Sequence, residues 1–209
     1  MHLIFIGAPG SGKGTQAEKL KNTKGYLHVS TGDLLRSEVS KGTPLGLKIK
    51  SLIDAGDLVD DNTVLELFSN NLSLGQSNYI LDGFPRTLNQ CNLLSDKLLK
   101  KYDYSAVYFE IDEEKVVERI VNRRIAPISG KIYNLIFDPP QNPGVCDVSG
   151  EKLIHRDDDK EDVVKNRLAI YRNSIVDILN YYSKLSKLHI LNASLSPEVV
   201  YEQILNILD

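Results

Sequence analysis

A glycine-rich turn near the start of the chain carries a lysine at the spacing of a phosphate-binding loop. It runs Gly7-Ala8-Pro9-Gly10-Ser11-Gly12-Lys13-Gly14-Thr15 and follows the apolar residues 3–6. An apolar strand, such a turn and then a helix form the context in which G-x-x-x-x-G-K binds phosphate. Backbone N–H groups, the positive end of the helix and the ammonium of Lys13 would face one anion. The sequence predicts a nucleotide-phosphate site, with an ordinary strand-to-helix turn as the alternative.

The residue after the lysine departs from the usual pattern. Gly14 stands where Ser or Thr is usual, and the hydroxyl comes one place later, at Thr15. One helical position turns a side chain by about 100°, so we do not expect Thr15 to bind magnesium directly. A magnesium ion held by the nucleotide and by water is expected instead, because this ion gives up its water reluctantly.

A second set of candidate site residues, with charged side chains, follows the apolar residues 79–81. Asp82 stands at the end of this predicted strand, and the turn Asp82-Gly83-Phe84-Pro85-Arg86-Thr87 adds a guanidinium. Ligands of open α/β sheets sit at the carboxyl ends of strands, where a phosphate-loop enzyme places its magnesium-side acid. Gly and Pro alone would make a structural turn, whereas Arg86 needs an anion or an acid nearby. A functional turn is therefore favoured.

Further cations are spaced along the chain. Lys115, Arg119 and Arg123 lie four apart, so they share one face of a predicted helix and repel each other unless an anion neutralises them. A solvated basic face is the alternative. Arg36 lies on the inner face of a predicted helical segment, and Arg156 and Arg167 flank a return to helix. The alternative for Arg156 is a surface ion pair with the neighbouring carboxylates, which are Asp157, Asp158 and Asp159.

Strands and helices that alternate along the chain predict an α/β domain. The expected strands are residues 3–6, 26–29, 79–81, 106–111 and 188–191. Residues 30–59 form a predicted helical insertion, broken at Gly42-Thr43-Pro44, and a helix is expected at residues 197–208. A second insertion is rich in Pro and Gly, with short strands predicted at residues 131–133 and 135–137.

Length and composition bound the class of protein. The 209 residues suit one α/β core with insertions, and 42% hydrophobic with 25% charged residues is ordinary for a soluble globular chain. The net charge of −3 argues against non-specific nucleic-acid or membrane binding. Cys91 and Cys146 form no C-x-x-C pair, and Met1-His2 leads straight into a strand without a signal segment. A cytoplasmic monomer is expected.

Taken in order, residues 7–15, 30–33 (Ser30-Thr31-Gly32-Asp33) and 82–87, with the arginines, resemble adenylate kinase in its long-lid form, within the nucleoside monophosphate kinase family. The resemblance implies a P-loop three-layer α/β core with a five-stranded parallel sheet (1–29, 60–121 and 160–209). It implies a helical NMP-binding insertion (30–59) and a small β-rich lid (122–159).

The resemblance also implies an activity. It is reversible phosphoryl transfer from MgATP to AMP giving two ADP, in purine nucleotide interconversion and energy homeostasis. A GTP-dependent or other nucleoside monophosphate kinase is the first alternative. A non-catalytic nucleotide-binding module is the second, which the many arginines disfavour because a switch needs one nucleotide site rather than two.

Site residues follow from the same resemblance, position by position. The catalytic cations would be Lys13, Arg86, Arg123, Arg156 and Arg167. ATP would be bound by Gly10, Ser11, Gly12, Lys13, Gly14, Thr15, Arg119, Arg123, Ile132, Tyr133 and Leu195. AMP would be bound by Thr31, Arg36, Asp57, Leu58, Val59, Gly83, Phe84, Pro85, Arg86, Gln90, Arg156 and Arg167.

Two expectations concern metals. Asp82 and Asp33 would orient water on the Mg²⁺ that is bound with ATP, with no direct protein ligand. Structural zinc is not expected, since the positions that match zinc ligands in metal-containing lids hold Ala126, Ser129, Cys146 and Ser149. Of these, only Cys146 is a strong zinc ligand.

Overall fold

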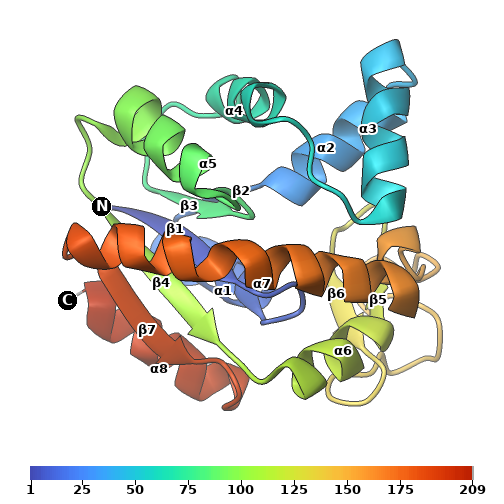
Figure 1. Ribbon diagram of the computed structural model, residues 1–209. Coiled ribbons are helices and arrows are strands. Elements are labelled where there is room, and N and C mark those ends of the chain that lie inside the picture. Colours follow the sequence, from blue (N-terminus) through green and yellow to red (C-terminus); the bar gives the residue numbers. More distant parts are fainter. Residues whose placement is uncertain (209) are drawn as a thin grey trace.

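A parallel sheet forms the centre of the computed structural model, which describes residues 1–208 (Figure 1). In this part of the chain the sheet has five strands, in the order β2-β3-β1-β4-β7. Their bounds are β1 His2–Gly7, β2 Leu27–Ser30, β3 Tyr79–Asp82, β4 Tyr104–Glu110 and β7 Leu188–Asn192. The predicted fold class is confirmed. Along residues 1–208, we find no helix with the length and hydrophobicity that crossing a membrane requires.

Helices cover both faces of the sheet because successive strand residues point to opposite faces. In β1, Ile4 and Ile6 belong to the core beneath one helical layer, and Leu3 and Phe5 to the core beneath the other. The first layer contains α4 Asp61–Ser69, α5 Leu88–Leu93, its π-helical continuation Leu94–Leu99, and α7 Glu161–Lys184. The second contains α1 Lys13–Lys24 and α8 Pro197–Leu208. The result is a three-layer core.

Strand register brings the predicted site residues together at the carboxyl ends of the strands. Phe5 of β1 pairs with Asp82 of β3, and Asp82 in turn pairs with Ser30 of β2. The phosphate-loop sequence begins at Gly7, the last residue of β1, so it lies near Asp82 and the beginning of α2. Parallel pairing thus places three sequence motifs side by side.

Two helices, α2 Thr31–Ser40 and α3 Pro44–Ala55, make up most of the predicted helical insertion. Ser30 caps α2 by accepting from the Asp33 N–H, and Thr43 caps α3 by accepting from the Gly46 N–H. A Cβ at Gly46 would lie 2.6 Å from the Glu38 carbonyl oxygen, so only glycine allows this approach of α3 to α2. The predicted break at residues 42–44 is confirmed.

Residues 122–159 form a small antiparallel unit beyond α6 Glu113–Val121. Its paired strands are β5 Arg123–Ile125 and β6 Ile132–Asn134, and it ends in the 3-10 turn Asp157–Asp159. The strand predicted at residues 135–137 is wrong, because these residues form a turn. The Asn134 side-chain oxygen accepts from the N–H groups of Ile136 (2.9 Å) and Phe137 (3.0 Å) and bends the chain there.

Hydrogen bonds join residues 128–133 of this small unit to residues 146–151. The Tyr133 hydroxyl lies 3.4 Å and the Ser129 hydroxyl 3.7 Å from the Cys146 sulfur. The Glu151 carboxylate accepts from the N–H of Ile128 (2.7 Å), the N–H of Ser129 (2.8 Å) and the Ser149 hydroxyl (2.7 Å). Within residues 1–208, no three His, Cys, Asp or Glu side chains are gathered as metal ligands would be.

Replacing Glu151 with alanine should therefore loosen the small unit and leave the core folded. Desolvation would raise the pKa of Glu151, but hydrogen bonds to the Ser129 and Ile128 N–H groups outweigh it and lower that pKa to about 2. The stabilisation should be lost as pH falls from 4.5 to about 2. Limited proteolysis should cut residues 122–159 several-fold faster in the variant, and equal cutting would contradict the idea. Glu161→Ala, which removes a surface pair with Lys165, is the control.

Candidate active site

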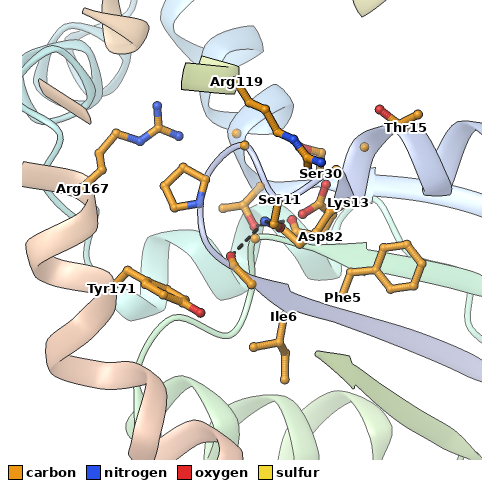
Figure 2. Close-up of a pocket in the computed structure, with 18 of the residues that line it drawn as sticks. Phe5, Ile6, Ser11, Lys13, Thr15, Ser30, Asp82, Arg119, Arg167 and Tyr171 are labelled. Carbon is orange, nitrogen blue, oxygen red and sulfur yellow. Dashed lines mark hydrogen bonds between the residues drawn. The ribbon is translucent and has the colours of Figure 1, made fainter. Parts of the chain in front are cut away.

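The glycine-rich turn between β1 and α1 folds around its own lysine. Gly10 and Gly12 have φ of +77° and +95°, a backbone region that favours glycine, and a Cβ at Gly10 would lie 2.5 Å from the side chain of Ile120. The Lys13 ammonium donates to the carbonyls of Gly7 and Ala8 (both 2.9 Å) and to the Ser11 hydroxyl (3.3 Å). Figure 2 shows Lys13 inside this loop and Thr15 apart from Asp82. The loop gathers N–H groups and one positive charge in one concave site.

Burial sets the ionisation of this lysine. Desolvation, together with repulsion from Arg86, Arg167 and Arg123, outweighs the attraction of Asp82 and lowers the pKa of Lys13 to about 8. The cation is thus held among other cations, in an environment that favours a bound anion.

A fall in kcat/KM for nucleotide above about pH 8 is expected as Lys13 loses its proton. The free energy of unfolding should change in the opposite sense. The folded protein penalises the charged form, and this penalty is complete below about pH 8 and relieved as pH rises towards 10.5. Kinetic and thermal-unfolding profiles over this range would measure both trends. A kcat/KM that stays constant through it would contradict the assignment.

Asp82 lies at the carboxyl end of β3, held by its neighbours. His28 of β2 approaches one carboxylate oxygen at 3.3 Å (Nε2 to Oδ2), and the Thr31 hydroxyl donates to the Asp82 carbonyl at 3.1 Å. Burial would raise the pKa of Asp82, but the hydrogen bond from His28 and the charge of Lys13 outweigh it, so that pKa is lowered. Asp82 is therefore a carboxylate with a fixed orientation. Sequence reasoning gave no histidine a role; only the pairing of β2 with β3 reveals this contact.

Arginines from separate elements face the same space, each beside a carboxylate. Arg123 donates to Asp159 at 2.8 Å (Nε) and 2.5 Å (Nη2), and Arg167 lies 3.0 Å from Asp158. Arg36 lies 2.6 Å from Asp33 and 3.8 Å from Asp158. These pairs hold the guanidinium groups in place.

Among residues 1–208, a surface ion pair of Arg156 with the three consecutive aspartates is not found, since none of them pairs with Arg156. Asp158 and Asp159 are not surface partners of Arg156, since they are 7% and 0% exposed and pair with Arg167 and Arg123. Only Asp157 lies at the surface, where it pairs with Lys160 at 2.8 Å. Arg156 instead approaches Asp33, at 3.9 Å. The 3-10 turn turns two of the three carboxylates inward, which composition alone does not show.

Arg86 has no carboxylate of this kind. Its Nε donates to the Gly83 carbonyl at 2.7 Å, and within residues 1–208 it forms no ion pair with an acid. Burial, followed by repulsion from Arg167, lowers the pKa of Arg86 to about 10. A partly buried cation without an acidic partner marks a place for an anion.

One cavity of about 680 Å³ runs from the glycine-rich loop to the α2–α3 pair. Every predicted site residue lines it except Phe84, whose side chain is fully buried against Phe68 in the core. His28 and Phe137 line it as well and were missed. A Phe in an apolar run gives no sequence signal, because the same run suggested a strand.

The cavity combines a phosphate-binding loop with cations from several elements. Figure 2 shows Arg119 of α6 and Arg167 of α7 reaching towards the loop from two different helices. Phosphoryl transfer requires in-line positioning and compensation of charge on the moving group, and little covalent chemistry from the protein. Guanidinium groups match phosphate geometry and stay charged at any working pH. The arrangement suits transfer between two phosphorylated ligands.

Comparison with known proteins identifies the family. The family model described as adenylate kinase matches residues 5–187. The chain belongs to the adenylate kinase family. It is 44% identical to an adenylate kinase of Petrotoga mobilis, over 100% of this chain and 97% of the relative, and 43% identical to one of Thermosipho africanus, over 100% and 99%. An adenylate kinase of Clostridium perfringens is 36% identical over 100% of this chain and 98% of the relative.

This adenylate kinase family member is an ATP:AMP phosphotransferase, which transfers a phosphoryl group reversibly from ATP to AMP and gives two ADP. The enzyme class predicted from the motifs is confirmed. The matched region includes the loop, the turn after β3 and all the paired arginines. Neither the GTP-dependent kinase nor the non-catalytic module considered above is favoured by these findings.

Proposed function

We propose that ATP and AMP lie tail to tail in the cavity and that transfer occurs where Lys13, Arg86, Arg123, Arg156 and Arg167 converge. The observation that carries this proposal is the lining of one cavity by cations from the loop, the turn after β3, the small unit and α7. Two polyphosphate tails would need such a distribution. One nucleotide at the loop would leave the distant cations without a role.

The donor would occupy the end of the cavity near α1. Its phosphates would be bound by residues 10–15, with Arg119 and Arg123, while Ile132, Tyr133 and Leu195 would line the nucleoside. AMP would occupy the end near α2 and α3. Its binding set would be Thr31, Arg36, Asp57, Leu58, Val59, Gly83, Pro85, Arg86, Gln90, Arg156 and Arg167, with Phe84 contributing through its backbone.

The residues present fit a magnesium ion that is bound through water. Asp82 is fixed by His28, and the Asp33 side chain is 60% exposed, so both can orient water molecules. No cluster for direct metal ligation occurs within the described residues. When bound with ATP, the ion would neutralise phosphate charge. The protein's own part is to hold these carboxylates towards the ion's water.

Two mobile parts would complete the site. Residues 30–59 would serve as the NMP-binding insertion and residues 122–159 as a lid, on a core of residues 1–29, 60–121 and 160–209. The pairs Arg36–Asp158 and Arg156–Asp33 join these two insertions. Closure would exclude water and prevent hydrolysis of ATP. We further propose a cytoplasmic monomer acting on ATP, AMP and ADP, without nucleic-acid or membrane partners.

A diadenosine ligand linked through its phosphates tests the two-site arrangement. It should bind competitively against both ATP and AMP, and Arg36→Ala and Arg119→Ala should each weaken it. A crossed assay with ATP or GTP as donor and AMP, GMP, UMP or CMP as acceptor would measure base preference. Binding that competes with only one nucleotide would refute the proposal.

A further inference from the structure

The side-chain amide of Gln90 is held at both of its ends. Its oxygen, Oε1, accepts from the Arg86 backbone N–H at 2.6 Å, and its nitrogen, Nε2, donates to Asp61 Oδ1 at 2.6 Å. Asp61 begins α4 and Gln90 lies in α5, so the contact joins two helices of one layer (Figure 1). Gln90 is 2% exposed and lines the cavity.

These two partners allow only one direction of the amide. An ionised carboxylate can only accept, and a backbone N–H can only donate. A Gln90 amide turned by half a rotation would place its oxygen against Asp61 Oδ1 and its nitrogen against the Arg86 N–H. Both contacts would become repulsive, and two partly buried polar groups would lose their partners. Asp61 itself is steadied on its other oxygen, where Asn89 Nδ2 donates to Oδ2 at 2.6 Å.

Helix capping alone accounts for only part of this arrangement. Thr87 caps α5 by accepting from the Gln90 N–H, and a Gln at this position often returns its side chain to the backbone before the helix. That role uses Oε1 and leaves Nε2 free to turn towards solvent. The bond to Asp61 comes from another helix and is not needed for the cap. With both bonds made, the Gln90 amide still has one hydrogen on Nε2 and one lone pair on Oε1 for a ligand.

We propose that Asp61 selects the acceptor base by fixing the direction of the Gln90 amide. The inference rests on the proposed placement of AMP beside Gln90. A fixed amide can donate to N1 of adenine and accept from its 6-amino group. A 6-oxopurine presents the reverse pattern, with a hydrogen on N1 and an acceptor at position 6. It would require the reversed amide that Asp61 and the Arg86 N–H oppose.

Asp61→Asn tests this role in the full enzyme with AMP and IMP as acceptors. These two nucleotides differ only at N1 and position 6 of the base, whereas GMP also carries a 2-amino group. Asparagine can turn its own amide to donate, so it removes one of the two contacts that oppose the reversed Gln90. The ratio of kcat/KM for AMP to that for IMP should fall about tenfold or more, mainly through KM. Asp60→Asn is the matched control, because it removes the same charge one residue away and retains a good helix cap. An unchanged ratio, or equal losses with AMP and IMP, would overturn the inference.

Analogues test the same idea in the unmodified enzyme, should the variant not fold. AMP lacking the ring nitrogen N1, and purine riboside monophosphate lacking the 6-amino group, should each raise KM about tenfold. If neither analogue raises KM, the inference fails. Gln90→Ala distinguishes a failure of the proposed AMP site from a failure of the role given to Asp61. An unchanged KM for AMP in this variant would refute the AMP site itself. A raised KM together with an AMP-to-IMP ratio unchanged in Asp61→Asn would refute only the role of Asp61.

Discussion

Replacing Lys13 with methionine is expected to lower kcat about a thousandfold, at the upper end of what one lost transition-state donor costs. The ammonium lies at the centre of the loop, bonded to the Gly7 and Ala8 carbonyls, in a surrounding that lowers its pKa to about 8. Methionine has a similar length and no charge, so the loop should keep its shape while the charge that faces the phosphates is lost. Steady-state kinetics of ADP formation would measure the effect.

Lys19→Met supplies the control for this experiment. Lys19 lies in the same helix, α1, forms a surface pair with Glu198 at 3.1 Å, and is not among the described residues that line the cavity. Its replacement should leave kcat unchanged. Circular dichroism should show that both variants are folded. Full turnover in Lys13→Met would refute the role given to the loop.

Arg86→Met is expected to lower kcat about 10²–10³-fold and, at the same time, to raise thermal stability. Arg86 is partly buried beside other cations, and desolvation together with repulsion from Arg167 lowers its pKa to about 10. Replacing a partly buried charge that lacks a carboxylate partner with an apolar side chain of similar volume relieves desolvation and repulsion. The melting temperature should rise by about 2–4 °C, which ~1 kcal/mol gives for a chain of this length.

Calorimetry and steady-state kinetics on the same preparation would test both effects. Arg172→Met is the control, because Arg172 is exposed and pairs with Glu113. That change should leave kcat unaffected and should not stabilise the protein. A melting temperature for Arg86→Met below that of the parent would show that Arg86 is compensated in the folded state and would contradict the argument.

The parts of the site that sequence predicts best are those made by local chain geometry. The loop at residues 7–15 and the turn after β3 are fixed by glycine conformations, proline and strand ends within a few residues of each other. Apolar patterning also predicted each of the five strands to within two residues at either end, whereas their arrangement in one parallel sheet was expected from the family resemblance. Thr43-Pro44 predicted the start of α3 because capping is a local interaction.

What sequence could not supply depends on contacts between distant residues. The pairing of Arg123 with Asp159 and the approach of His28 to Asp82 arise from tertiary placement. The burial of Phe84 against Phe68 likewise depends on where α4 packs. The error at residues 135–137 had a local cause: an apolar run suggested a strand, whereas the single Asn134 side chain favoured a turn.

The carboxylates that stand beside the arginines change what nucleotide binding can gain. When a phosphate takes up Arg123 or Arg167, it replaces Asp159 or Asp158 in an existing pair, so each new bond is offset by one that is given up. In the proposed two-site arrangement, exchange of this kind would keep affinity moderate for both reactants and both products. For a reversible enzyme, the same carboxylates would then hasten product release by reclaiming the guanidinium groups as each ADP departs.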